Sequence, residues 1–227
     1  MMSQQQNALR EYSIEHPHSA YPTNRSHSYD FNDMITILVG EEEHRFTAHK
    51  DMLCAKSKFF KAACSKVWAS GREKIVRQPE GAPEDFQIYV EWVYTSKISL
   101  DTDDLDEQQV RLMDLYILAD VIDDYQLRNA TMKRLIANAR KGIKNFPREQ
   151  LLKVYAATMA GSPLRRFIVN WALTTFDRDK IESYIAHEPA EFVQELAVAA
   201  VEQVAPMDAD EAFEFMTVMC ALEKYSG

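Results

Sequence analysis

Glycine is scarce in this sequence: only six of its 227 residues are glycine, and no two of them lie closer than ten positions apart. A loop that binds phosphate needs several glycines close together, because its backbone must approach the phosphate without a Cβ in the way. The scarcity therefore excludes nucleotide sites built on a P-loop or on a GxGxxG turn.

Cysteine and long apolar runs are also scarce. The three cysteines, Cys54, Cys64 and Cys220, show no CxxC spacing and leave one thiol unpaired, which indicates a reducing compartment. Residues 1–28 have neither the apolar core nor the basic start of a signal peptide. The longest aliphatic run, 196–201, is six residues, whereas a membrane span needs about 20. We therefore expect a protein of the cytoplasm, the nucleus or both, with no membrane partner.

Negative charge dominates, with 35 Asp and Glu against 26 Lys and Arg and a net charge of −9. This balance argues against a general nucleic-acid or anionic-membrane binder. Segment 101–124 has nine acids and one base, 128–148 has seven bases and no acid, and 182–227 has ten acids and one Lys. The basic stretch 128–148 lacks interleaved aromatics, so we expect a helix surface partly neutralised by the neighbouring acids. A docking surface for an acidic protein and a nucleic-acid face are the alternatives.

The pattern of apolar residues predicts an α+β protein. Residues 1–28 have almost nothing to bury and predict a disordered tail. Residues 33–39 and 44–48 predict a hairpin whose first strand is buried on both faces, and 74–77 predict a further short strand. Helices are expected over 50–64 with Ser57 as an N-cap, after Pro83, over 110–122 and on to about 140, followed by four or five helices within 148–225. The best domain break lies near 142–147.

No pattern of residues predicts catalysis or metal binding. There is no GxSxG, and His187-Glu188 lacks the second His of a zinc-protease helix. His16 and His18 alone do not make a zinc site, and the acidic segment 101–107 lacks the Gly and Glu that a calcium loop requires. We therefore expect no enzyme, cofactor, metal or small-molecule substrate. Cys54 and Cys64 are expected to be inert thiols in helices.

Over about residues 29–140 the sequence resembles a BTB/POZ domain. The resemblance rests on residues in the family's order and spacing: Asp33-Met-Ile-Thr-Ile-Leu-Val39, Phe46-Thr-Ala-His49-Lys50, Leu53, Ser57, Phe59-Phe60, Phe86, Val90, Trp92-Val-Tyr94-Thr95, Ile98, Leu115-Tyr-Ile-Leu-Ala-Asp120, Tyr125 and Leu127. The acidic connection and the helical tail most resemble BTB proteins of filamentous fungi.

The resemblance implies a BTB/POZ fold at 29–142, a small, mostly three-stranded sheet flanked by helices, followed by an all-α extension at 147–225. It also implies a non-enzymatic protein-interaction module that forms a homodimer and recruits or scaffolds other proteins. The candidate dimer residues lie in the first helices after the hairpin: Met52, Leu53, Lys56, Phe59, Phe60 and Ala63. Asp33, His49 and Lys50 match polar positions of the family.

An alternative implied by the resemblance is a substrate adaptor of a cullin-type ubiquitin ligase. The possible cullin contacts are Trp68, Glu73 and Tyr116. Trp68 is expected in a connection between helix and strand, where its ring either covers the core or meets a partner. Gly71 stands two residues before Glu73, where such adaptors carry an apolar anchor. A second alternative is a nucleic-acid-linked regulator that uses the basic stretch 128–148.

Overall fold

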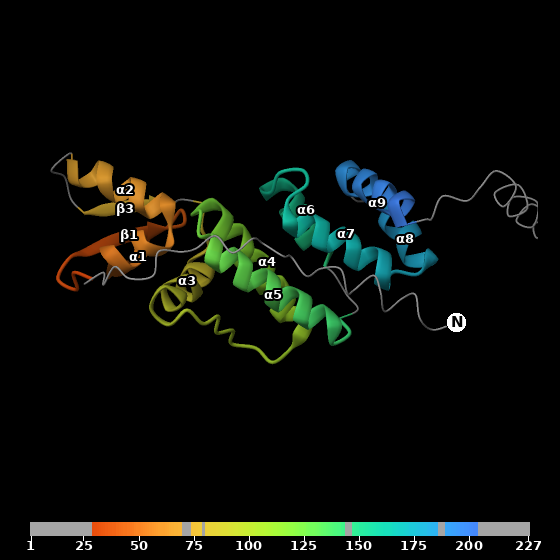
Figure 1. Cartoon of the computed structure of the whole chain (residues 1–227), viewed down its shortest axis with the longest axis horizontal. Helices are drawn as coiled ribbons and strands as arrows, with labels where there is room; N and C mark the ends of the chain where they lie inside the picture. Colours follow the sequence, from red (N-terminus) through yellow and green to blue (C-terminus); the bar gives the residue numbers. More distant parts are fainter. Residues whose placement is uncertain (1–28, 70–73, 79, 144–146, 186–188, 204–227) are drawn as a thin grey trace, which may run out of the picture. The chain divides into compact units, whose positions relative to one another are not determined.

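A three-stranded sheet with the order β2-β1-β3 organises the first half of the structure. Strand β1 (Met34–Val39) runs antiparallel to β2 (His44–His49), with Met34 opposite His49 and Val39 opposite His44. Strand β3 (Ile75–Gln78) lies on the other side of β1 and runs parallel to it. The computed structural model describes residues 29–69, 74–78, 80–143, 147–185 and 189–203 (Figure 1).

The hairpin is confirmed, but its first strand is buried on one face only. Ile35, Ile37 and Val39 are buried. Met34 is exposed, and Thr36 and Leu38 are only half-buried. Successive side chains of a strand point to opposite faces of the sheet, so one covered face produces this alternation. The prediction of burial on both faces was wrong, because the β-branched residue Thr36 and the aliphatic Leu38 face the more open side.

Five helices follow the hairpin in the predicted order, with β3 between the second and the third of them. They are α1 (Lys50–Lys56), α2 (Lys58–Ala69), α3 (Pro83–Thr95), α4 (Leu105–Val121) and α5 (Tyr125–Arg140). Pro83 opens α3, where its missing N–H is not needed. The Asp104 side chain caps α4 by accepting a hydrogen bond of 2.9 Å from the Glu107 backbone N–H, so part of the acidic connection has a structural role.

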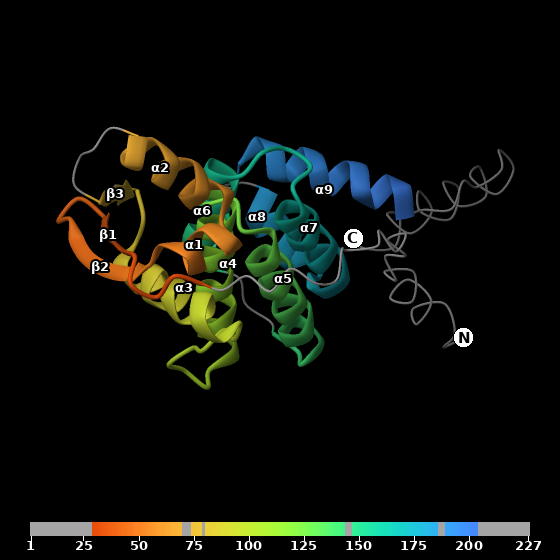
Figure 2. The ribbon, with the colours of Figure 1, turned by 60° about the vertical axis from the view of Figure 1, so that its left-hand side comes forward.

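The remaining described helices continue the chain without a strand. They are α6 (Arg148–Ala157), α7 (Pro163–Thr175), α8 (Arg178–Ile185) and α9 (Ala190–Gln203). Figure 2 shows α6, α7 and α9 close to one another, and their apolar residues form one cluster with residues of α4 and α5. The predicted tail 1–28 and the predicted last helix beyond 203 lie outside the described residues.

The C-terminal helices are continuous with the core of the preceding helices. Leu112, Met113 and Tyr116 of α4 share a hydrophobic cluster with Leu151 and Val154 of α6. The described residues from Phe31 onward accordingly belong to one compact unit. The break predicted near 142–147 is therefore a connection between helices that share a core. At Gly142, a φ of 95° places the chain in the left-handed region that favours glycine.

Candidate interaction surface

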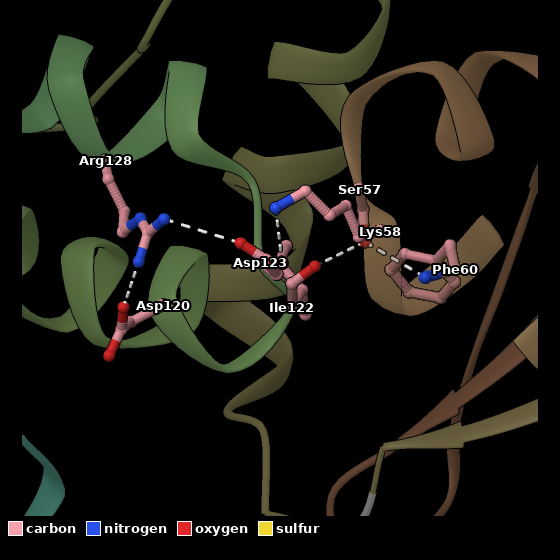
Figure 3. A network of polar contacts seen from close by, with 7 residues as sticks. All are labelled: Ser57, Lys58, Phe60, Asp120, Ile122, Asp123 and Arg128. Atoms are coloured by element: carbon pink, nitrogen blue, oxygen red, sulfur yellow. Dashed lines mark hydrogen bonds and ion pairs between the residues drawn. The ribbon is translucent and has the colours of Figure 1, made fainter. Parts of the chain in front are cut away.

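The turn between α1 and α2 is held in place by Ser57. Its Oγ accepts a hydrogen bond of 3.0 Å from the Phe60 backbone N–H, which confirms the predicted N-cap of α2. The same hydroxyl donates to the Ile122 carbonyl oxygen at 2.5 Å (Figure 3). One buried serine therefore starts α2 and fastens it to the turn between α4 and α5.

Charged side chains strengthen the same junction from its solvent side. Lys58 Nζ lies 3.1 Å from Asp123 Oδ2, and Asp123 has a positive φ of 51° in the α4–α5 turn. Arg128 bonds Asp120 and lies 3.4 Å from Asp123 Oδ1 (Figure 3). These pairs are partly exposed and each stabilises the fold only weakly. Together with the hydrogen bond from Ser57 to the Ile122 carbonyl oxygen, these ion pairs hold α2 against the α4–α5 turn.

The structure divides the predicted dimer residues of α1 and α2 into two groups. Leu53 and Phe60 are fully buried in the core under the sheet, where Phe60 stacks on Tyr89 with ring centroids 6.1 Å apart. These two positions are corrected: their side chains face the chain's own core and are not available to a partner. The side chains that stay half-buried, and can still be reached, are Met52, Lys56, Phe59 and Ala63.

Lys56 is engaged by the chain itself. Its Nζ lies 5.1 Å above the Trp92 ring and donates to Ser96 Oγ at 2.9 Å and to Gln126 Oε1 at 3.1 Å. Trp92 Nε1 in turn donates to the buried carboxylate of Asp124 at 3.1 Å. Burial raises the pKa of Asp124, while hydrogen bonds from Leu127 and Trp92 oppose that shift. Lys56 therefore connects α1 to α3 and α5. This anchoring makes more rigid the surface formed by the half-buried side chains Met52, Lys56, Phe59 and Ala63, here called the α1–α2 face.

The predicted polar positions Asp33 and Lys50 form an ion pair just before β1. Lys50 Nζ lies 2.6 Å from Asp33 Oδ2, and Lys74 bonds the other oxygen of the same carboxylate. The hydrogen bond from Lys50 is the largest cause of a lowered pKa at Asp33, and the same bond raises the pKa of Lys50. The pair joins the start of β1 to the start of α1 and to the segment that enters β3.

The third polar position, His49, packs among aromatic side chains. Tyr94 Oη accepts a hydrogen bond of 3.0 Å from the His49 backbone N–H, and it also lies within hydrogen-bonding distance of His49 Nδ1, at 2.8 Å. The Phe31 ring meets the His49 ring edge-on at 5.3 Å. Phe31 is 59% exposed, and Met34 and Tyr94 are also exposed. Phe31, Met34, His49 and Tyr94 form a patch beside the α1–α2 face. The sequence did not indicate this patch, because Phe31 precedes the predicted strand.

Of the possible cullin contacts, only Tyr116 has a described side chain, and it is buried. It belongs to the cluster shared by α4 and the C-terminal helices, and burial raises its pKa. The prediction of a cullin contact at Tyr116 is corrected, because helices that follow in the sequence cover this face of α4. Trp68 lies in the last turn of α2 and not in a connection, and its side chain lies outside the described residues. Gly71 and Glu73 also lie outside them.

Intramolecular contacts use part of the basic stretch 128–148. Arg128 pairs with Asp120 and Asp123, as the prediction of neutralisation by neighbouring acids requires. Arg134 donates to the Ile98 carbonyl oxygen at 2.7 Å. Three bases are exposed on the outside of α5 and just after it: Lys133, Arg140 and Lys141. Arg128 and Arg134 therefore make contacts within the fold.

Polar contacts that the sequence did not reveal fix α6 to α4. Asp114 of α4 is only 12% exposed and lies 2.7 Å from Lys153 Nζ and 2.7 Å from Gln150 Nε2, both of α6. Asp85 of α3 is buried close enough to Asp114 for that carboxylate to raise its pKa, with burial as the larger cause. A pair of carboxylates from α3 and α4 therefore has a counter-ion from the C-terminal helices.

A second buried contact fixes the C-terminal helices to one another. Arg165 of α7 donates to the Tyr155 carbonyl oxygen at 2.7 Å and to Thr158 Oγ1 at 3.1 Å, and its guanidinium lies over the Tyr155 ring at 4.3 Å. Glu195 of α9 lies 3.5 Å from Arg165 and accepts from Tyr155 Oη at 2.7 Å. Helices α6, α7 and α9 are joined by one satisfied charge network.

Two negative findings apply to the described part of the chain. Within it, no three His, Cys, Asp or Glu side chains converge as a metal site would require. None of its helices combines the length and apolar character that a membrane crossing needs. The exposed features of the described residues are the α1–α2 face and the patch around His49.

Comparison with known proteins gives one match to a family model. A family model described as BTB/POZ domain matches residues 24–130. The matched segment covers a little less than half of the chain. BTB domains mediate protein–protein interaction and dimerisation, and they are generally interaction modules without enzymatic activity. The predicted fold, a small three-stranded sheet with many helices that continue into the C-terminal part, is confirmed.

Two solved structures are also similar to part of this chain. The BTB domain of zebrafish PATZ1 is 22% identical, over 45% of this chain and 75% of that one, with a TM-score of 0.36. The BTB (Tramtrack and Bric a brac) domain of human Gigaxonin is 13% identical, over 44% of this chain and 75% of that one, with a TM-score of 0.35.

Proposed function

We propose that this protein is a non-enzymatic interaction module that forms a homodimer through the α1–α2 face and recruits or scaffolds other proteins. The observation that carries the proposal is the character of that face. Met52, Phe59 and Ala63 leave apolar surface accessible on two helices that Ser57 fixes against the α4–α5 turn. A rigid apolar face loses little conformational freedom on binding, so more of its contact energy appears as affinity.

The surface next to the face extends the same character. Ala55 of α1 and Ala62 of α2 are exposed, and Val121 and Tyr125 are exposed on either side of the turn that α2 contacts. Small and apolar residues at these positions let a second helical surface approach closely. A dimer contact of this kind places the patch around His49 and the C-terminal helices within reach of further partners.

The experiment compares the mass of full-length variants by sedimentation equilibrium. Ala62→Glu adds a charge to an exposed position of the face without touching the core, so it should dissociate the dimer while the helical circular dichroism stays unchanged. Met159→Glu is the matched control, because Met159 follows α6 and is 83% exposed. It should leave the dimer intact. A folded Ala62→Glu variant that remains a dimer as tight as wild type would overturn the placement of the interface.

A cullin adaptor is the second candidate function. Some BTB domains bind cullin-3, and here the C-terminal helices share a core with α4, so both would be presented as one surface. Co-elution of the full chain with a cullin N-terminal region in gel filtration would support this candidate, and separate elution would remove it. A role in nucleic-acid regulation through 128–148, a cytoplasmic or nuclear location and a kinship with BTB proteins of filamentous fungi remain proposals from the sequence.

A further inference from the structure

The outer face of α9 is apolar and is not covered by any of the described residues. Phe192 and Leu196 on its inner face are buried in the cluster that α9 shares with α6 and α7. Val201 lies nine residues after Phe192 and points the opposite way, because each residue turns a helix by about 100°. Val201 is 73% exposed, Val198 is 60% exposed, and Ala197 is also exposed. The outer surface made by these last three residues is here called the α9 stripe.

The α9 stripe differs from a scatter of single exposed apolar residues. Its three members are neighbours on one side of one helix, and such a continuous apolar face is typical of a contact surface. Helix α9 ends at Gln203, two residues after Val201. The part of the chain that follows α9 therefore starts at one end of the stripe.

The sequence after α9 has the pattern of an amphipathic helix. Apolar side chains recur at positions i, i+3, i+4, i+7 and i+10, which are Ala212, Phe215, Met216, Met219 and Leu222. Asp210, Glu214 and Thr217 fall on the opposite side of the same helical pattern. Pro206 comes three residues after Gln203 and is typical of the position just beyond a helix end. The pattern predicts a second helix with one apolar face, separate from α9.

The lengths of the connection and of the segment match the α9 stripe. Residues 204–210 make a connection of about seven residues, within the range that joins neighbouring helices in bundles. A connection this short places consecutive helices side by side and antiparallel. As a helix, residues 211–222 span about 18 Å, whereas the stripe from Ala197 to Val201 spans about 6 Å. One helix is therefore long enough to cover the whole stripe.

We propose that the α9 stripe is the docking site of this chain's own C-terminal segment, residues 211–222, which covers it as an antiparallel amphipathic helix. Phe215, Met216 and Met219 face Val198 and Val201, and the acidic side of the segment faces solvent. The segment thus closes the array of C-terminal helices with a polar outer face, as the last unit of a helical array requires. The proposal does not depend on a dimer through the α1–α2 face.

Hydrogen exchange of the full chain, followed by mass spectrometry of its peptides, tests the proposal. In wild type, the amides of 211–222 should exchange at least about tenfold more slowly than those of an unstructured peptide of the same sequence. Val198→Asp places a charge on the stripe and should remove most of this protection, while peptides of α6 and α7 keep their wild-type rates. Ala137→Asp is the matched control on the exposed side of α5 and should leave the protection of 211–222 unchanged.

Cross-linking identifies the occupant of the stripe. Cys54 and Cys64 are replaced by Ala, which leaves Cys220 of the segment as the native thiol, and Val198→Cys adds a second thiol on the stripe. A short bismaleimide should then join residues 198 and 220 in a product that keeps the single-chain mass. With Ala137→Cys in place of Val198→Cys, the same reagent should give no such link.

Three results would overturn the proposal. The first is unprotected exchange of 211–222 in wild type, and the second is protection that stays complete in a folded Val198→Asp protein. The third is a link from 198 to 220 found only between two chains, which would make a second copy the occupant. Wild-type exchange alone decides the outcome if a substituted protein does not fold.

Discussion

Asp85 should make the stability of the fold depend on pH, in a direction opposite to that of an ordinary ion-paired carboxylate. Its side chain is 5% exposed, and Oδ1 has no hydrogen-bond partner among the described residues. Burial and then the charge of Asp114 raise its pKa from 3.8 to about 6, although Lys153 and Arg111 oppose the shift. Each pKa unit corresponds to about 1.4 kcal/mol, so the ionised form costs the folded state about 3 kcal/mol.

The sign of the effect follows from which state binds the proton more tightly. Because the pKa of Asp85 is higher in the folded state, the penalty is absent below 3.8, grows as the pH rises, and is complete above about 6. Asp85→Asn stays neutral, so at about pH 8 it should raise the free energy of unfolding by about 1–3 kcal/mol over wild type. At about pH 4 the two proteins should differ by less than about 1 kcal/mol.

Urea unfolding followed by tryptophan fluorescence at both pH values measures this difference. The matched control is Glu84→Gln, because Glu84 is the exposed neighbour of Asp85 in the first turn of α3. It should show little change in stability at either pH. The same stability difference between Asp85→Asn and wild type at both pH values, or an Asn variant that is less stable at high pH, would refute the reasoning about Asp85.

Three further comparisons test the packing on which the interaction surface rests, each by the free energy of unfolding in urea. Asp124→Ala removes the cap of α5 and the acceptor of Trp92 Nε1, and should cost about 2–3 kcal/mol. Arg165→Met removes the donor to the Tyr155 carbonyl oxygen and to Thr158 Oγ1, and it removes the cation beside Glu195. It should cost about 3 kcal/mol, while the exposed control Arg166→Met should be nearly neutral. Phe60→Ala should cost about 3–5 kcal/mol and Phe59→Ala clearly less, and equal losses would contradict the assignment of Phe60 to the core and Phe59 to the surface.

The elements of the first half of the chain could be predicted because local sequence determines them. Alternating apolar residues in β1, the Ser57 cap and the Pro83 start each depend on neighbours within a few positions. The direction of adjacent apolar side chains could not be predicted in the same way. Phe59 and Phe60 are equally apolar, and only the packing of α2 on the sheet decides that Phe60 turns inward.

The burial of α4 was predictable, but the elements that cover it were not. Apolar residues all round 110–122 predicted a central helix, and the structure has Leu112, Met113 and Tyr116 buried there. The pattern does not say which helices supply the cover, because the contacts to α6 join residues 36–39 positions apart, as in Asp114–Gln150 and Asp114–Lys153. The family resemblance suggested Tyr116 as a possible cullin contact, whereas the structure has this side chain in the core.

The central claim is that the chain associates with a second copy through the α1–α2 face, and one measurement tests it most directly. The absolute mass of wild type and of Ala62→Glu is determined by light scattering after gel filtration at the same concentrations. The account predicts about twice the chain mass of 26.2 kDa for wild type and a single-chain mass for the variant. A single-chain mass for wild type at every concentration, or a dimer for both proteins, would contradict it.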